Sequence, residues 1–140
     1  MDSSDNVIPS ANSTMAKNLL LLSKYFDNGE YEQISLTQLN NILEDAIKNP
    51  IYYSNWLMVV DMHLHLKSEL IIMGKNAKKY LKKIHSIYLP NVLITGSTSD
   101  SQLPLCANRY SENKTLFYLC KDKACALPEE DIEVLLQKIH

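Results

Sequence analysis

The sequence lacks the features that mark several common classes of protein. Its three cysteines, Cys106, Cys120 and Cys125, are too few and odd in number for a secreted disulfide scaffold, so we expect a reducing, cytoplasmic setting. No apolar run approaches the roughly 20 residues of a membrane span, and the acidic, polar start at Met1 lacks the basic segment of a signal peptide. A net charge of -2 offers little attraction for nucleic acid or an anionic membrane, so neither is expected as a partner.

Glycine is also scarce, with three in 140 residues, and no glycine-rich nucleotide-binding motif is present. The turn at Gly96 lacks the lysine and second glycine of a P-loop and the spacing of a dinucleotide-binding fold. No Ser/His/Asp or Cys/His nucleophile pattern is recognisable, and Glu129 and Glu130 fit the positive end of a helix dipole better than acid–base catalysis. The residues alone define no catalytic site, we expect no cofactor, and whether the chain is an enzyme stays open.

Helical periodicity dominates the first half of the chain. After a short entry over residues 1–8, an apolar run predicts a helix that begins near Ser10 and ends at the turn over residues 27–29. Its expected core face carries Met15, Leu19, Leu22 and Phe26.

Two further helices are predicted before Lys67. Ser35 and Gln38 have the spacing of a capping box, which indicates a helix start, and Pro50 stops that helix. A third helix, over residues 52–66, has enough apolar residues for substantial burial.

The pattern changes after Lys67. Residues 69–74 and 91–96 are short apolar runs that end in glycine and are typical of buried strands. A lysine-rich amphipathic helix is expected between them, over residues 76–88. Because strand, helix and strand follow each other within some thirty residues, they predict a parallel pair.

The predicted fold class is α/β, or α+β for the chain as a whole. About three N-terminal helices are followed by a small, mainly parallel sheet of three strands with two helices. The third strand is expected over residues 115–120, and Pro128 marks the first position of the last helix. We expect two parts: a helical segment over residues 1–67 and a small α/β subdomain over residues 68–140.

Asp61, His63 and His65 form a D-x-H-x-H pattern, the first candidate for a ligand set. On a strand the three side chains would share one face. On a helix, residues two apart point about 200° apart, so the two histidines could not share a metal. Because the surrounding periodicity predicts a helix, we expect no metal site.

Cys120 and Cys125 lie at the end of the third predicted strand and are the redox candidates. Their C-x4-C spacing matches neither the CxxC redox motif nor half of a zinc site. Either Cys125 folds back across a turn to form a reversible disulfide with Cys120, or one is a core residue and the other lies in a loop.

The expected helix over residues 76–88 has a strongly basic face. Such a face is typical of a solvated surface, with a phosphate or acidic-partner site as the alternative. The lysines on or beside this helix are Lys75, Lys78, Lys79, Lys82 and Lys83.

Three segments together carry a family resemblance. Residues 8–13 and 15–20 read Ile-Pro-Ser-Ala-Asn-Ser and Met-Ala-Lys-Asn-Leu-Leu, similar to a P-S-[GA]-N-S stretch that opens a late helix. Residues 69–74 and 88–93 resemble a strand–helix–strand segment, and residues 116–125 resemble a terminal Y-V-C-x4-C segment. In this order they resemble the thioredoxin-domain protein family that includes spermatogenesis-associated protein 20, over nearly the whole chain.

The resemblance implies the C-terminal piece of a larger protein. Full-length members resemble an N-terminal thioredoxin-like domain fused to an (α/α) toroid, similar to six-hairpin glycosidases and N-acylglucosamine 2-epimerases. A carbohydrate-related role is implied, with this chain not catalytic by itself, because it has no CxxC and too few helices to close a toroid. The start at Met1, just before a matching motif, is expected of a truncated gene product or a trimmed chain.

The resemblance also implies site residues and partners. Pro9, Ser10, Asn12 and Ser13 would lie at a helix N-terminus facing the toroid's central cavity. Free N–H groups there favour an anionic or polyhydroxylated, carbohydrate-like small molecule. The two cysteines match the family's terminal pair, for which the resemblance supplies no role.

An alternative function is a non-catalytic docking or stabilising module, with a thiol switch at the cysteine pair as a third option. The docking module predicts an exposed apolar patch on the first three helices. Its partners would be the upstream domains of the parent protein, and self-association would use the exposed helical faces.

Overall fold

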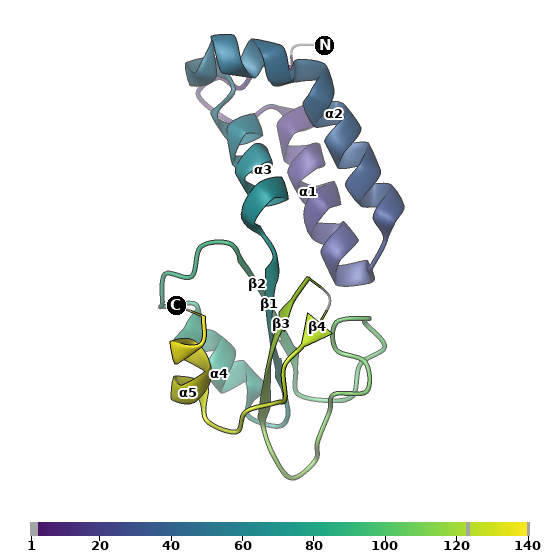
Figure 1. The fold of residues 1–140 in the computed structure, drawn as a ribbon, viewed down its shortest axis with the longest axis vertical. Helices are drawn as coiled ribbons and strands as arrows, with labels where there is room; N and C mark the ends of the chain where they lie inside the picture. Colours follow the sequence, from purple (N-terminus) through teal and green to yellow (C-terminus); the bar gives the residue numbers. More distant parts are fainter. Residues whose placement is uncertain (1–2, 123, 140) are drawn as a thin grey trace. The chain divides into compact units, whose positions relative to one another are not determined.

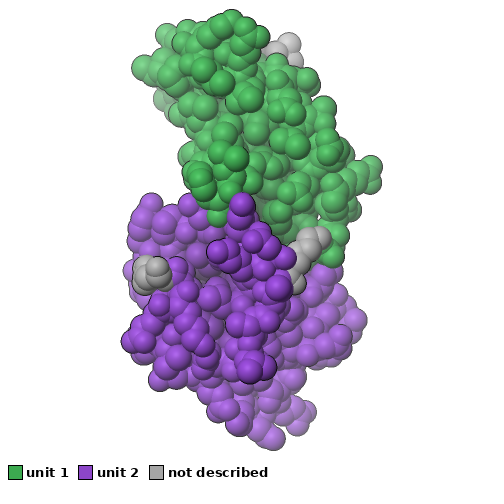
Figure 2. Space-filling model, viewed as in Figure 1, with its two compact units in different colours: residues 1–65 green, residues 66–140 purple. Residues whose placement is uncertain are grey.

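A computed structural model describes residues 3–122 and 124–139, and the chain divides into two compact units (Figure 2). The helical unit is residues 1–65 and the sheet unit is residues 66–140. The helical unit contains α1 (Ala11–Phe26), α2 (Gly29–Lys48), the short 3-10 helix η1 (Pro50–Tyr52) and α3 (Ser54–His65) (Figure 1). The sheet unit contains β1 (Ser68–Met73), α4 (Ala77–Ile84), β2 (Val92–Ser97), β3 (Leu116–Lys121), β4 (Ala124–Cys125) and α5 (Ile132–Gln137).

The fold is α+β, with a sheet of strand order β2-β1-β3-β4. The predicted parallel pair is confirmed, because β1 runs parallel to β2. The prediction of three strands was wrong, since β4 adds a fourth that is two residues long and too short to show periodicity. The sheet is also not mainly parallel, because the β1–β3 and β3–β4 pairs in the described residues are antiparallel.

The start and end of α1 are confirmed. Ser10 is the N-cap, and its hydroxyl accepts a hydrogen bond from the Ser13 N–H at 3.1 Å. Asp27 ends the helix with a left-handed φ of 48°.

The face through which α1 packs differs from the predicted one. We call Met15, Leu19, Leu22 and Phe26 the α1 stripe. Met15 and Phe26 are each 53% exposed and Leu22 is 40% exposed, so this stripe is not in the core. The residues that α1 buries are Ser13, Ala16, Leu20 and Ser23. Three of these four residues are small, so α1 packs through small side chains and Leu20, while Met15, Leu22 and Phe26 are left outside.

Helix α2 begins seven residues earlier than predicted, with its N-cap at Asn28 instead of Ser35. The Asn28 side chain accepts from the N–H groups of Glu30 and Tyr31, at 2.9 and 3.3 Å, and caps the helix there. Ser35 is therefore an interior residue rather than an N-cap. It is fully buried, and its hydroxyl donates to the Ala16 carbonyl of α1 at 2.8 Å. A side-chain bond to the backbone of α1 requires the two helices to lie close together. The small residues on the buried face of α1 permit this close approach.

The last helix also begins later than predicted. Its first residue is Ile132 rather than Pro128, and the side chain of the N-cap Asp131 accepts from the Glu133 N–H at 2.8 Å. Residue Glu129 instead exchanges two backbone hydrogen bonds with Phe117 of β3, each 2.9 Å long. The segment before α5 is thus held beside the sheet, where a helix could not form the same bonds.

The sheet unit buries both faces of β1. One face packs with α4 and α5 through a core cluster whose buried members are Leu70, Ile72, Ala77, Ile84, Phe117, Ile132 and Leu135. The other face packs with the connection between β2 and β3 through Ile71, Met73, Cys106 and Cys120. Burial on both sides explains why β1 reads as a continuous apolar run.

Candidate functional sites

The first candidate site is the polar N-terminus of α1. Ser13 is fully buried, and its hydroxyl lies 2.6 Å from Asp5 Oδ1 and 3.0 Å from the Ser10 carbonyl oxygen. The Asn55 side-chain amide donates to Ser13 Oγ at 2.9 Å. Ser10 and Ser13 are therefore engaged in hydrogen bonds within the chain, while Pro9 is exposed.

Asp5 is the centre of this polar network, although the sequence showed only an irregular entry segment. Its carboxylate accepts the Ser10 N–H at 2.8 Å and the N–H groups of Asn55 and Trp56 at 2.9 and 3.3 Å. One buried carboxylate thus caps the N-terminus of α3 and holds Ser10, the N-cap of α1, in place. Burial alone would raise the pKa of Asp5, but the bonds from Ser13 and these three amides outweigh it and lower the pKa.

A hollow of about 220 Å³ lies beside this network in the helical unit. Asn12 lines it, whereas the other three predicted residues do not. Gln38 also lines it, and its Oε1 atom is buried with no hydrogen-bond partner in the described part of the chain. The remaining lining residues are Ser3, Asn41, Ile42 and Trp56. The hollow is therefore lined by carboxamide side chains, while the Gln38 Oε1 atom itself is buried.

The Asp61, His63 and His65 pattern lies on α3, as the periodicity predicts. His65 Nδ1 contacts Asp61 Oδ1 at 2.7 Å, one helical turn away. His63 Nε2 lies 3.1 Å from the Ser35 hydroxyl. Burial lowers the pKa of His63; the charge of Lys24 lowers it further, and the charge of Glu32 opposes the change. Over residues 3–122 and 124–139, no group of three or more His, Cys, Asp or Glu residues is placed to hold a metal.

Parts of the basic helix face and the Gly96 turn lie together in the sheet unit. Lys78, Gly96, Ser97 and Thr98 line a hollow of about 260 Å³, together with Ala77 and Leu81. The sequence placed these features on separate elements, and the parallel β1–α4–β2 connection brings them together. The hollow combines one lysine with two hydroxyl side chains, but it still lacks a phosphate-binding motif.

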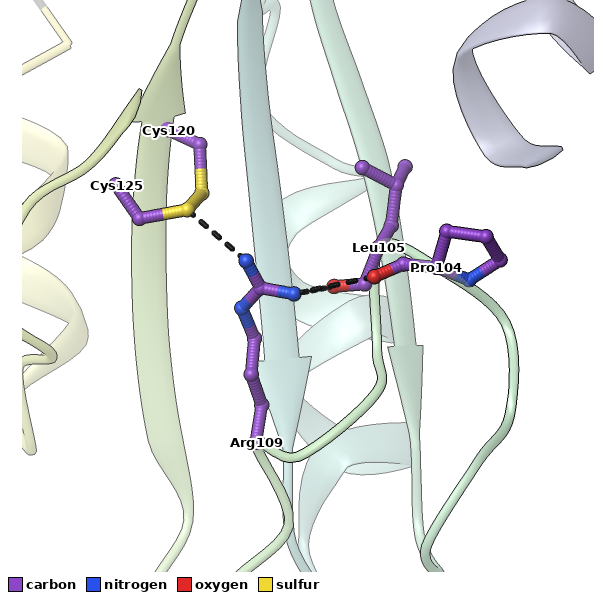
Figure 3. The surroundings of a disulfide bond; sticks show 5 residues. All are labelled: Pro104, Leu105, Arg109, Cys120 and Cys125. Atoms are coloured by element: carbon purple, nitrogen blue, oxygen red, sulfur yellow. Dashed lines mark hydrogen bonds between the residues drawn. A yellow bond between two sulfur atoms is a disulfide. The ribbon is translucent and has the colours of Figure 1, made fainter. Parts of the chain in front are cut away.

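The second candidate site is the cysteine pair. Cys120 on β3 and Cys125 on β4 are partners in the antiparallel register and are joined by a disulfide (Figure 3). The disulfide replaces the interpretation in which the two cysteines are independent core and loop residues. Cys106 is free and buried, and burial raises the pKa of its thiol.

Arg109 lies against this disulfide and was not singled out by the sequence. Its Nη2 is 3.1 Å from Cys125 Sγ, while Nη1 donates to the carbonyl oxygens of Leu105 at 2.6 Å and Pro104 at 3.3 Å (Figure 3). Sixteen residues separate Arg109 from Cys125, and only the folded connection between β2 and β3 brings them together. No local sequence signal could have found this contact.

No helix in the described part of the chain is long and apolar enough to cross a membrane. No protein-family model matches the chain, and no solved structure matches it.

Comparison with curated proteins does find relatives. The chain is 27% identical over 150 residues to human spermatogenesis-associated protein 20 and 28% identical to the rat protein of the same name. Each match covers 99% of this chain but 19% of the relative, so the chain spans about a fifth of the length of these relatives. Over nearly its whole length, the chain is homologous to spermatogenesis-associated protein 20.

Proposed function

We propose that the helical unit is a non-catalytic docking module, whose α1 stripe packs against an apolar helix supplied from outside this chain. The α1 stripe carries the proposal. Its four residues, at positions 15, 19, 22 and 26, follow the alternating four-and-three spacing of a coiled-coil seam. Three of them are at least 40% exposed, whereas most apolar helix faces in a folded unit are covered.

The relatives support a helix as the occupant. They extend far beyond the region that this chain matches, so they contain ample sequence to supply one. An (α/α) toroid of the kind implied by the resemblance is built from helical hairpins, which would present such helices next to α1. A knobs-into-holes contact with one of them would remove the stripe from water.

Phe26→Lys should strongly weaken this docking. A lysine at this site would have to be desolvated in the contact, so we expect binding to weaken at least tenfold. The binding partner in the assay is human spermatogenesis-associated protein 20 lacking its matched region, expressed as a separate chain, and binding is measured by calorimetry. The matched control is Ile47→Lys, which replaces an exposed apolar residue in the last turn of α2.

Equal binding by the Phe26→Lys and Ile47→Lys variants would place the contact on another face. Sedimentation of the chain alone provides a second outcome. A dimer that the Phe26→Lys change dissociates would make a second copy the occupant, which contradicts the proposed one. A monomer that binds nothing would contradict docking altogether.

A second candidate function is the binding of a small, neutral, polyhydroxylated molecule in the hollow lined by Asn12, Gln38 and Asn41. The carboxamide lining favours it, because carboxamides both donate to and accept from ligand hydroxyls, and Gln38 in this lining has an Oε1 atom without a partner in the described residues. This would give the implied carbohydrate relation a location in the helical unit.

Gln38→Leu should have two effects: it should remove this ligand binding, and it should raise the stability of the helical unit. Leucine cannot accept the ligand hydroxyl, and it also removes a buried oxygen without a partner, so we expect a gain of about 1 kcal/mol in the free energy of unfolding. A panel of neutral monosaccharides is titrated while the fluorescence of Trp56, the single tryptophan, is followed. Gln33→Leu, on an exposed part of α2, is the control. A response that persists in the Gln38→Leu variant would exclude this site.

A further inference from the structure

The two sulfur atoms of the disulfide differ in their access to solvent. Cys120 is 1% exposed and belongs to the buried cluster with Ile71, Met73 and Cys106. Cys125 lies on the two-residue strand β4 and is exposed. Thiol–disulfide exchange needs a thiolate to reach one sulfur directly. In this fold Cys125 is therefore the accessible residue of the pair.

Arg109 places a positive charge beside that same sulfur. The guanidinium is held independently of the disulfide, through its bonds to the carbonyl oxygens of Pro104 and Leu105. It also lies over the Tyr118 ring, 5.7 Å from its centre, while the Tyr118 hydroxyl donates to the Arg109 carbonyl at 3.1 Å. A fixed cation 3.1 Å from Cys125 Sγ would stabilise the thiolate that forms there on reduction.

We propose that Cys120–Cys125 is a redox-active disulfide that exchanges with a glutathione-type thiol through Cys125, with Arg109 as the positioning residue for the Cys125 thiolate. The exposed cysteine is the exchanging sulfur, and the buried one is the resolving sulfur. This inference does not depend on the docking function, because every residue it uses lies in the sheet unit.

Reduction takes two steps that balance. A glutathione thiolate attacks Cys125 Sγ and forms a mixed disulfide, while the Cys120–Cys125 bond breaks and the Cys120 sulfur leaves and takes a proton. A second glutathione thiolate then attacks the glutathione sulfur of the mixed disulfide. Glutathione disulfide departs, and Cys125 is left as a thiolate beside Arg109. Two electrons pass from two glutathione molecules to the protein disulfide, and oxidation runs the same steps in reverse.

The experiment has two parts, both on the 140-residue chain. Both use the Cys106→Ala background, so that any thiol detected belongs to Cys120 or Cys125. In the first, the folded protein is equilibrated in glutathione buffers from oxidising to reducing, quenched in acid and labelled with a thiol-specific mass tag. We expect a reversible change between no tags and two tags, within the range that glutathione buffers cover. If the pair stays oxidised in reduced glutathione while the fold is intact, the proposal is overturned. This part of the test needs no substitution of Cys120 or Cys125.

The second part tests the roles of the two sulfurs and of Arg109. Cys120→Ala should accumulate a mixed disulfide with glutathione on Cys125, visible in the intact mass, whereas Cys125→Ala should accumulate none on the buried Cys120. In the Cys120→Ala background, Arg109→Met should slow formation of the mixed disulfide from glutathione disulfide roughly tenfold, and Arg109→Lys should restore most of the rate. Equal labelling of the two cysteines contradicts the assignment of Cys125. If Arg109→Met and Arg109→Lys slow formation of the mixed disulfide equally, the proposed role of the positive charge at position 109 is contradicted.

Discussion

Replacing Asp5 with asparagine should lower the free energy of unfolding of the helical unit by about 3 kcal/mol. The carboxylate accepts four hydrogen bonds, from the Ser13 hydroxyl and from the N–H groups of Ser10, Asn55 and Trp56. An amide would turn an NH2 group toward these donors and leave some of them buried without a partner. The N-terminus of α3 would lose its cap, and Ser10, the N-cap of α1, would lose the bond that holds it in place.

Trp56 makes this prediction measurable within the helical unit. It is the single tryptophan, it is 1% exposed, and its Nε1 donates to the Ser3 carbonyl at 2.8 Å. Its fluorescence during urea unfolding therefore follows the unit that contains Asp5. The matched control is Asp45→Asn, an exposed aspartate on α2, for which we expect a change within about 0.5 kcal/mol. Similar midpoints for the two variants would contradict the proposed role of Asp5.

The same carboxylate gives the helical unit an acid sensitivity. Because the folded-state pKa of Asp5 is lowered, the unfolded chain binds its proton more readily than the folded chain does. The stabilisation is complete above the unfolded pKa and is lost as the pH falls through the folded pKa, which places the loss below about pH 4. The Asp5→Asn variant should lack this part of the acid dependence. An unchanged acid profile would mean that other carboxylates determine it.

Replacing Gly96 with alanine should destabilise the sheet unit by about 3 kcal/mol. Gly96 is the partner of Ile72 in the parallel β1–β2 pair. A Cβ at this position would lie 2.3 Å from the Ile72 carbonyl oxygen and 3.2 Å from its carbon, and both are backbone atoms that cannot rotate away. The two strands would have to separate locally, near the end of the β1–β2 pair.

Amide hydrogen exchange of peptides from β1 and β2 measures this effect without involving the helical unit. We expect faster exchange in both strands of the Gly96→Ala variant. Gly29→Ala is the control, because no atom lies within 4 Å of a Cβ at that position, and we expect equal or slightly greater stability there. Unaltered protection of β1 and β2 would show that the strands can absorb the added methyl group.

Local signals in the sequence were enough for many of the elements. The helix start near Ser10 and the turn at Asp27 were predicted correctly for α1, because both depend on contacts within a few residues, although Ser10, Asn12 and Ser13 were equally good N-cap candidates. The parallel pairing of β1 and β2 followed from two apolar runs joined by a helix. The helical state of Asp61, His63 and His65 followed from periodicity as well.

Only the tertiary structure decided which α1 face is buried and where the polar partners lie. Periodicity shows that α1 has an apolar stripe, but the burial of Ser13, Ala16 and Ser23 depends on how closely other helices approach. Asp5 gained its role from Asn55, fifty residues away, and Arg109 gained its contact with Cys125 from a folded connection between strands. Contacts between residues far apart in the chain leave no local pattern, and for that reason the sequence predicted the helices and strands better than the sites they form.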